Sequence, residues 1–428
     1  MPEYLKKAEF QSAAASDEVA AIVSAIVRAV EKEGLAAVRH YSAQLDGWDP
    51  EQFMVSEQEI DGAAETVPAE LKKHLQFAID QVRTFAMAQR ATLRDLDLET
   101  LPGVTLGHRH VPVRSVGSYA PGGRYPLIAS SIMTVAVPKV AGVSRVVACA
   151  PPRDGLGIHP AQLYAMASAG ADEIYCIGGV QALAAMAFGI EGMPPVDMLV
   201  GAGNVYVAEA KRQLFGQVGI DLIAGPTEIL IIADEMAEPE LLAADMLGQA
   251  EHGPTSPAVL LTTSLTLAEA VREAVDTWLR TDWPTAKIAG EAWRCHGEIA
   301  VCQDDDELVS IADQYAPEHL EVQTAHPDWF HARLSNYGSL FLGQEATVAY
   351  GDKAIGTNHV LPTGRASRYT GGLWVGKFLK TVTYQKVTPE GTREVAPAVA
   401  AISSAEMMDG HALTARMRLE RVERWTQS

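Results

Sequence analysis

Between residues 111 and 235, short runs rich in β-branched residues alternate with alanine-rich stretches of helical spacing. Strands that alternate with helices in this way are typical of βαβ units around a mostly parallel sheet, so this feature limits the fold more than any other. The expected strands are Arg145 to Ala150, Glu173 to Gly178, Asp197 to Gly201 and Glu228 to Ala233. The expected helices are His159 to Gly170, Val180 to Phe188 and Asn204 to Phe215, each ended or followed by glycine.

A second alternation begins after residue 236 and predicts a second sheet, which could be a relative of the first. Its expected elements are helix Glu238 to Glu251, strand Ala258 to Thr263, helix Leu267 to Arg280 and strand Glu298 to Val301.

The two ends of the chain lack this alternation of strands and helices. Apolar residues at helical spacing predict helices at Val19 to Tyr41 and Pro68 to Leu93. Near the C-terminus, strand-like Lys380 to Gln385 precedes a helical stretch from Pro397 to Trp425, with Pro397 suited to a helix start and Gly410 a candidate break. We therefore predict an α/β fold with a helical N-terminal region (1–110), two Rossmann-like but incomplete α/β domains (111–235 and 236–374), and a small C-terminal tail (375–428).

The composition excludes several classes of function. A formal net charge of −20 offers no basic face for a nucleic acid. No run of ~20 uncharged apolar residues predicts a membrane span, and the start of the chain lacks the layout of a secretory signal. Four cysteines are too few and too widely spaced for a disulfide framework. We expect a cytoplasmic protein with reduced, mostly core cysteines.

Two polar clusters could carry chemistry. Gln249 and His252 are three apart near the end of a predicted helix, so both could reach one ion; alternatively, His252 interacts with the last helix carbonyls. The adjacent Glu318 and His319 have ordinary pKa values about 2 units apart, which suits two proton-transfer tasks; alternatively, they lie in a surface turn.

Two further groups are weaker on their own. Asp352 and His359 lie in a glycine-punctuated loop, which could equally be an ordinary turn. Glu406 and His411 are five apart, roughly 140° around an ideal helix, and could simply be exposed. The segment Gly201-Ala-Gly203-Asn204 lacks the third glycine of a dinucleotide fingerprint, so that motif alone supports no cofactor site.

Several motifs, taken in order, resemble those of the histidinol dehydrogenase family, from about Tyr119 to His411. They are Tyr119-Ala-Pro-Gly-Gly123, Gly178-Gly-Val-Gln-Ala182, Gly203-Asn204, Glu209-Ala-Lys-Arg212, Ala224-Gly-Pro-Thr-Glu228, Gln249-Ala-Glu-His-Gly-Pro254, Tyr315-Ala-Pro-Glu-His-Leu320 and Gly356-Thr-Asn-His-Val-Leu-Pro-Thr363.

The resemblance implies a role for each matching residue. Gln249, His252 and Asp352 match zinc ligands, and His411 matches a ligand donated by the neighbouring subunit of a homodimer. Glu318 and His319 match the catalytic pair, and Thr227, His359 and Glu406 match residues that hold the substrate, which the zinc ligands and His319 would also face. Residues of the first α/β domain match NAD contacts: Tyr119, Gln181 and Asn204.

The implied reaction is two successive oxidations of a primary alcohol in one site. His319 would take the alcohol proton as hydride leaves for NAD, and Glu318 would then activate water to hydrate the bound aldehyde. A second hydride transfer would give the carboxylate.

Some positions depart from the family pattern. Lys377 stands where the family tends to carry an acidic residue, and Arg365 and Arg368 lie nearby in the sequence. Because histidinol is cationic, basic residues near its pocket favour a small anionic alcohol instead. The pattern resembles the sulfopropanediol 3-dehydrogenase branch, which converts 2,3-dihydroxypropane-1-sulfonate to sulfolactate; L-histidinol dehydrogenase and a non-catalytic, metal-stabilised dimer are the alternatives.

Overall fold

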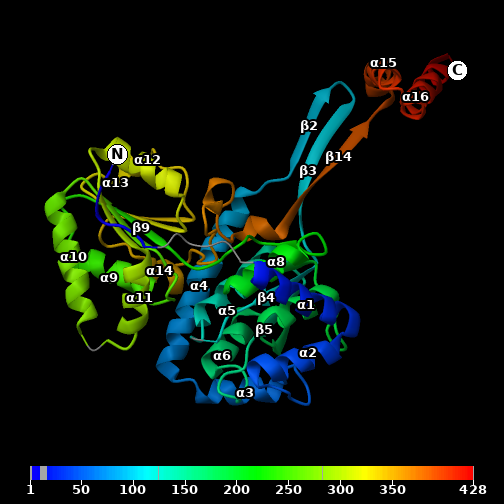
Figure 1. Ribbon diagram of the computed structural model, residues 1–428. Helices are drawn as coiled ribbons and strands as arrows, with labels where there is room; N and C mark the ends of the chain where they lie inside the picture. The colour runs from blue at the N-terminus through cyan, green and yellow to red at the C-terminus, as the bar shows by residue number, and fades with distance from the viewer. Residues whose placement is uncertain (1, 10–16, 124, 282, 428) are drawn as a thin grey trace. The chain divides into compact units, whose positions relative to one another are not determined.

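The structure is a computed structural model that describes residues 2–9, 17–123, 125–281 and 283–427 (Figure 1). It divides into two compact units. The first comprises Met1–Gln89 and Val113–Phe378, and the second comprises Arg90–Pro112 and Leu379–Ser428. All four cysteines are buried thiols, as the sequence predicts. In the part of the chain that the structure describes, no helix combines the length and apolar character needed to cross a membrane.

The first sheet of the larger unit has five parallel strands in the order β6-β5-β4-β7-β8. Numbered along the chain, this is order 3-2-1-4-5, which is an incomplete Rossmann arrangement. The strands are β4 (Ser115–Tyr119), β5 (Arg145–Ala150), β6 (Glu173–Cys176), β7 (Met198–Val200) and β8 (Gly219–Ile220). Three of the four strands predicted between residues 145 and 233 are in this sheet, and the three predicted helices between them are present, with small shifts of their ends. The fourth strand, Glu228 to Ala233, also forms, but as β9 (Ile229–Ala233) it belongs to the second sheet.

Helices cover both faces of this sheet. One face shares a core with α1 (Asp17–Glu33), α2 (Leu35–Tyr41), α7 (Gly179–Phe188) and α8 (Val205–Leu214). The other face packs on α5 (Ile128–Ala141), where the Ser118 hydroxyl of β4 donates to Thr134 Oγ1 at 2.6 Å. Helix α5 packs on α6 (Pro160–Ala169), which contacts α3 (Glu57–Thr66). Helix α4 (Ala69–Thr92) follows α3 in the chain.

The second sheet repeats the order of the first. Its strands run β1-β11-β10-β9-β12-β13, and the five parallel ones again have order 3-2-1-4-5, while β1 pairs antiparallel at the edge. The strands are β1 (Glu3–Lys6), β9 (Ile229–Ala233), β10 (Ala258–Thr262), β11 (Gly297–Val301), β12 (His319–Gln323) and β13 (Ser339–Leu342). The predicted relationship between the two sheets is confirmed by this shared order.

Two hydrophobic cores enclose the second sheet. One face packs on α9 (Pro239–Ala250), α10 (Leu265–Leu279), α11 (Ala286–His296) and α14 (Val348–Lys353). The other face packs on α12 (Asp305–Tyr315) and α13 (Pro327–His331). Figure 1 shows the same division, with α12 and α13 on the side of the sheet away from α9, α10 and α11.

The smaller unit is a three-stranded antiparallel sheet followed by a helical hairpin. The strands are β2 (Leu96–Leu101), β3 (Val104–Pro112) and β14 (Leu379–Val387), with β3 in the middle. The helices α15 (Pro389–Ala405) and α16 (Asp409–Gln427) pack on each other. The region 1–110 is thus helical over α1 to α4, as predicted, but it also contains the unpredicted strands β1, β2 and most of β3.

One predicted helix start was wrong. Pro397 lies inside α15, whose first residue is Pro389 and whose N-cap, Thr388, accepts a hydrogen bond from the Gly391 N–H at 3.3 Å. Because proline fits the first turn of a helix without losing a bond, both prolines carry a start signal, and Thr388 decides between them. The break between the two helices lies at Met407, which has a left-handed φ of 58°, and not at Gly410.

Candidate active site

The predicted catalytic pair lies at the amino ends of two neighbouring parallel strands. Thr227 and Glu228 directly precede β9, and Glu318 directly precedes β12, which opens with His319. The Glu318 carboxylate accepts hydrogen bonds at Oε2 from the Thr227 hydroxyl at 2.5 Å and from the Glu228 N–H at 3.0 Å. Burial raises the pKa of Glu318 to about 8, so its protonated form persists close to neutral pH.

His319 is buried between two carboxylates. Its Nδ1 lies 3.0 Å from the Glu228 carbonyl oxygen and 3.5 Å from Glu318 Oε2, and its Nε2 lies 3.3 Å from Asp352 Oδ1. Burial lowers the pKa of His319, but Glu318 and Asp352 outweigh burial and raise it to about 9. Burial also opposes ionisation of Asp352, but its contact with His319 holds its pKa well below the usual range.

Gln249 connects the last turn of α9 to this pair. Its Nε2 donates to the Thr227 hydroxyl oxygen and lies 3.4 Å from His319 Nδ1. Gln249, Thr227 and Glu318 therefore form a chain of hydrogen bonds, in which the threonine hydroxyl accepts from the amide and donates to the carboxylate. This chain uses the Nε2 end of Gln249, so the amide oxygen is the atom left to bind a metal ion.

His252 follows the end of α9 and is a neutral imidazole at pH 7. Burial lowers the pKa of His252 to about 4, with Lys353 and His319 lowering it further and Asp352 opposing them. A neutral imidazole beside an ionised carboxylate suits a metal ligand. Among the described residues, no group of three histidine, cysteine, aspartate or glutamate side chains could hold a metal ion by itself.

His359 has partners at both ring nitrogens. Nδ1 lies 3.1 Å from the Asp352 carbonyl oxygen, and Nε2 lies 2.8 Å from the hydroxyl oxygen of Ser130 on α5. Burial lowers the pKa of His359 to about 4, so the neutral ring donates from Nδ1 and accepts from Ser130 at Nε2. Sequence reasoning did not assign Ser130 to the site, because no local motif connects it to His359.

The three predicted NAD contacts follow the carboxyl ends of strands in the first sheet, where ligands of such sheets bind. Tyr119 ends β4 and accepts a hydrogen bond at Oη from the Gly179 N–H at 3.1 Å. Gln181, in the first turn of α7, donates from Nε2 to Asp46 Oδ2 at 2.9 Å, and its buried Oε1 has no partner in the described part of the chain. Asn204 caps α8 by accepting the N–H groups of Tyr206 and Val207, both at 3.1 Å.

A buried ion pair fixes the loop at Gly201, which follows β7 and lies beside Tyr119. Lys211 pairs with Asp221 and donates to the Gly201 carbonyl at 2.8 Å, while Asp221 Oδ2 accepts the Gly201 N–H at 2.8 Å. Gly201 has a φ of 125°, and a Cβ there would overlap the Tyr119 carbonyl oxygen, so only glycine fits. Sequence reasoning missed the role of Lys211, because Asp221 belongs to no motif.

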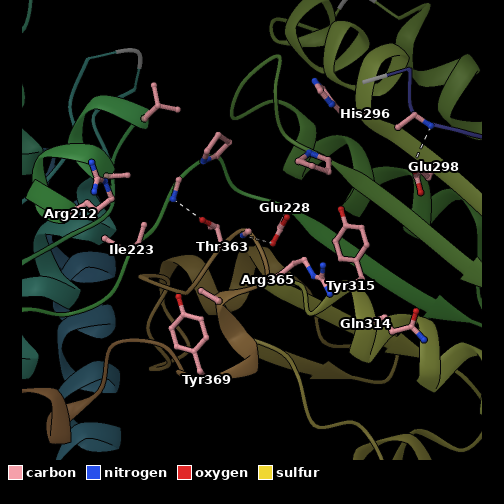
Figure 2. A pocket seen from close by; sticks show the side chains of 18 of the residues that line it. Arg212, Ile223, Glu228, His296, Glu298, Gln314, Tyr315, Thr363, Arg365 and Tyr369 are labelled. Atoms are coloured by element: carbon pink, nitrogen blue, oxygen red, sulfur yellow. Dashed lines mark hydrogen bonds between the residues drawn. The ribbon is translucent and has the colours of Figure 1, made fainter. Parts of the chain in front are cut away.

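The three basic residues expected near an anionic substrate lie apart from the catalytic pair. Arg365, with a left-handed φ of 68°, lines a hollow of about 870 Å³, and Figure 2 shows its side chain gathered with those of Glu228 and Tyr315. Arg368 Nε donates to the Arg365 carbonyl at 3.0 Å, and Lys377 donates to Thr370 at 2.7 Å. In the described part of the chain, no hydrogen bond or ion pair joins any of the three to Glu318 or His319. Their contact with an anion stays a prediction.

Glu406 and His411 belong to the smaller unit, and both side chains are exposed. Glu406 caps the end of α15, and His411 lies in the first turn of α16. His411 is predicted to bind zinc in a neighbouring subunit and Glu406 to hold the substrate, and both roles stay predictions.

Comparison with known proteins identifies the family. The family model described as histidinol dehydrogenase matches residues 10–419. A "Histidinol dehydrogenase homolog" of Shouchella clausii is 52% identical over 98% of this chain and 99% of that protein. The "Sulfopropanediol 3-dehydrogenase" of Ruegeria pomeroyi is 49% identical over 97% of this chain and 96% of that protein. A crystal structure of histidinol dehydrogenase from Elizabethkingia anophelis has a TM-score of 0.91 at 32% identity, over 96% of this chain and 94% of that one. The chain is a member of the histidinol dehydrogenase family, and therefore a dehydrogenase of the kind that uses NAD.

Proposed function

We propose that the protein is a zinc-containing, NAD-dependent dehydrogenase that oxidises a small anionic primary alcohol to a carboxylate in two steps. The observation that carries the proposal is the buried pair of Glu318 and His319, fixed by Thr227, the Glu228 backbone and Asp352. A carboxyl group and an imidazole held together in this way can each transfer one proton per turnover.

The side chains that would hold zinc fit the ion chemically. Gln249 presents an amide oxygen, His252 is neutral and Asp352 is ionised, which gives one nitrogen and two oxygen donors from this chain. We propose that His411 of a second copy completes the ligand set in a homodimer. For NAD, the buried Oε1 of Gln181, which has no partner among the described residues, is a free hydrogen-bond acceptor two residues from Gly179, whose N–H donates to Tyr119. When bound, zinc would polarise the substrate oxygen and NAD would accept hydride.

The residues of this chain would then act in sequence. His319 takes the proton of the alcohol in the first oxidation. His319 can take this proton only as a neutral imidazole. A metal ion bound to the Asp352 carboxylate would offset its negative charge, so that Asp352 would no longer favour the protonated form of His319. Glu318, in its ionised form, then removes a proton from the water that adds to the aldehyde, and the Thr227 hydroxyl keeps its carboxylate oriented. His359 and Glu406 would hold the substrate.

Two observations favour a sulfonate, with 2,3-dihydroxypropane-1-sulfonate as the substrate and sulfolactate as the product. The relative named sulfopropanediol 3-dehydrogenase is 49% identical, compared with 42% for a relative named histidinol dehydrogenase from Gluconobacter oxydans. Arg365 also lines a hollow that includes Glu228, whose backbone contacts both catalytic residues. L-Histidinol is the second candidate, because the shared fold and the Glu-His pair would serve it equally.

An NADH-release screen tests the proposal. The purified protein is given NAD with hydroxylated sulfonates, phosphates, carboxylates or L-histidinol, and the NADH formed per alcohol is counted. We expect about two NADH per sulfonate molecule, because two hydrides leave each alcohol. A preference for histidinol would instead indicate an L-histidinol dehydrogenase of histidine biosynthesis. If no alcohol yielded NADH, the result would favour a non-catalytic, metal-stabilised dimer.

A further inference from the structure

A row of polar side chains runs along the buried face of β12. His319, Glu321 and Gln323 alternate with Leu320 and Val322, which pack into the opposite core with α12 and α13. Side chains two apart on a strand point to the same face, so the polar row faces the core that contains α9 and α14. Opposite Glu321, the neighbouring strands present Ile231 and Phe341, which cannot stabilise a charge.

Glu321 is fully buried and bonded to two elements. Its Oε1 accepts the N–H of Val348, the first residue of α14, at 3.0 Å. Its Oε2 accepts from Gln323 Nε2 at 3.0 Å, and the same amide nitrogen also donates to Asp245 on α9. Two carboxyl groups held against one amide in a buried site repel each other when both are charged, so Glu321 and Asp245 share one proton.

Asp245 extends the same network to the start of α14. Its Oδ1 accepts from the hydroxyl of Thr347, which is the N-cap of α14, at 2.9 Å, and its Oδ2 accepts from Gln323 Nε2 at 3.1 Å. Burial raises the pKa of Asp245, and burial together with Asp245 raises that of Glu321 to about 8. The fully buried Glu321 is therefore the partner that holds the proton, and Asp245 keeps the charge.

The network around the carboxyl pair is adjacent to the candidate active site along three elements: α9, α14 and β12. Asp245 precedes Gln249 by one turn of α9, and Val348 precedes Asp352 by one turn of α14. On β12, Glu321 is two residues from His319 and on the same face. Each element thus carries one member of the network and one member of the site.

We propose that Glu321 and Asp245 are positioning residues, which share a proton and thereby fix Gln249 and Asp352 against His319. The proposal rests on the proposed function, because it assigns the pair to the same zinc and proton-transfer site. Residues that orient metal ligands typically change metal affinity or activity by about 10–100-fold when removed.

The experiment compares E321A, E321Q and D245A with wild type and with E269A, which removes an exposed glutamate of α10 as a matched control. Three quantities are measured: the rate of zinc release to a chelator, the melting temperature, and kcat and the KM for NAD with the best alcohol. We expect E321A and D245A to release zinc and to lose kcat by about 10-fold or more, with little change in the KM for NAD, whose predicted contacts lie on the first sheet.

The glutamine variant distinguishes a shared proton from a buried charge. E321Q has the shape of the protonated acid and can still donate to Asp245, and the Gln323 amide can turn to suit it because its Oε1 has no partner in the described residues. E321Q should therefore change zinc release and kcat by well under the roughly 10-fold that is the lower end of the loss on removing such a residue. If E321A does not fold, D245A and E321Q decide the outcome.

Two results would overturn the proposal: E321Q failing as badly as the alanine variants, or E321A and D245A keeping zinc and kcat at the level of E269A. A wild-type chain that holds zinc but oxidises no alcohol would instead remove the proposed function. The zinc-release comparison would still test the pair in that case, so the two failures are distinguishable.

Discussion

His319 Nε2 lies 3.3 Å from Asp352 Oδ1, so the proposed base of the reaction and a proposed zinc ligand are in direct contact within a buried site. This contact couples any change in the carboxylate to the histidine. It also connects β12 to α14, which are joined as well by the hydrogen bond from the Val348 N–H to Glu321.

Asp352→Asn removes the charge while keeping the shape of the side chain. We expect zinc affinity to fall by about 100-fold or more, since a neutral amide replaces an ionised oxygen donor, and kcat to fall with it. Metal content after dialysis and NADH release measure the two effects. Full activity in a protein that has lost its zinc would contradict the assignment of Asp352 and of the metal site.

Glu318→Gln should separate the two half-reactions. The amide still accepts from Thr227 or Glu228 but cannot take a proton from water, so the aldehyde-to-acid step should slow by about 10²–10⁴-fold and the alcohol step by much less. Single-turnover assays started from the alcohol or from the aldehyde measure each step. Equal losses in both would remove the proposed role of Glu318.

Lys211→Met tests the loop that joins the predicted NAD contacts. The substitution leaves the Asp221 carboxylate buried without its cation, which should cost about 3–5 kcal/mol of unfolding free energy. The KM for NAD should rise as well, because Lys211 and Asp221 hold Gly201 beside Tyr119. Denaturant unfolding and NAD titration check the two expectations, with Lys287→Met, which replaces an exposed lysine of α11, as the control for stability.

Arg365→Ala tests the contact with the anion. If the guanidinium bonds to the sulfonate, its loss should remove about 1.5–3 kcal/mol of binding, which is roughly a 10–100-fold rise in KM. Arg272→Ala, on the exposed side of α10, supplies the control. An unchanged KM for the sulfonate would contradict a contact with Arg365 and would leave Arg368 and Lys377 as the candidates.

Local sequence pattern predicted most of the two α/β halves, because both sheets are buried and their strands and helices have strong periodicity. In the smaller unit it predicted the strand Lys380 to Gln385, which is β14, and the helical C-terminus, but it missed β2 and β3. Strand β2 has six exposed residues and is stabilised by pairing with β3, which in turn pairs with β14 from the other end of the chain. Pairing between such distant segments left no local signal in β2 or β3.

The site residues also fall into those that local sequence motifs revealed and those that they did not. Residues in motifs, such as Glu318 and Gln249, could be assigned from the resemblance to a family. Ser130, Asp245 and Glu321 could not, because each acts through a partner that is distant in the sequence: His359 for Ser130, and α14 for the two acids. Their importance follows only from three-dimensional contacts.

The two sheets of the larger unit share the 3-2-1-4-5 strand order, yet their predicted functional residues lie at opposite ends of the strands. The first sheet has its predicted cofactor contacts at the carboxyl ends, where such sheets usually bind ligands, whereas the second has Glu318 and His319 at the amino ends. A search for functional residues at the carboxyl edge of the second sheet would therefore overlook both Glu318 and His319.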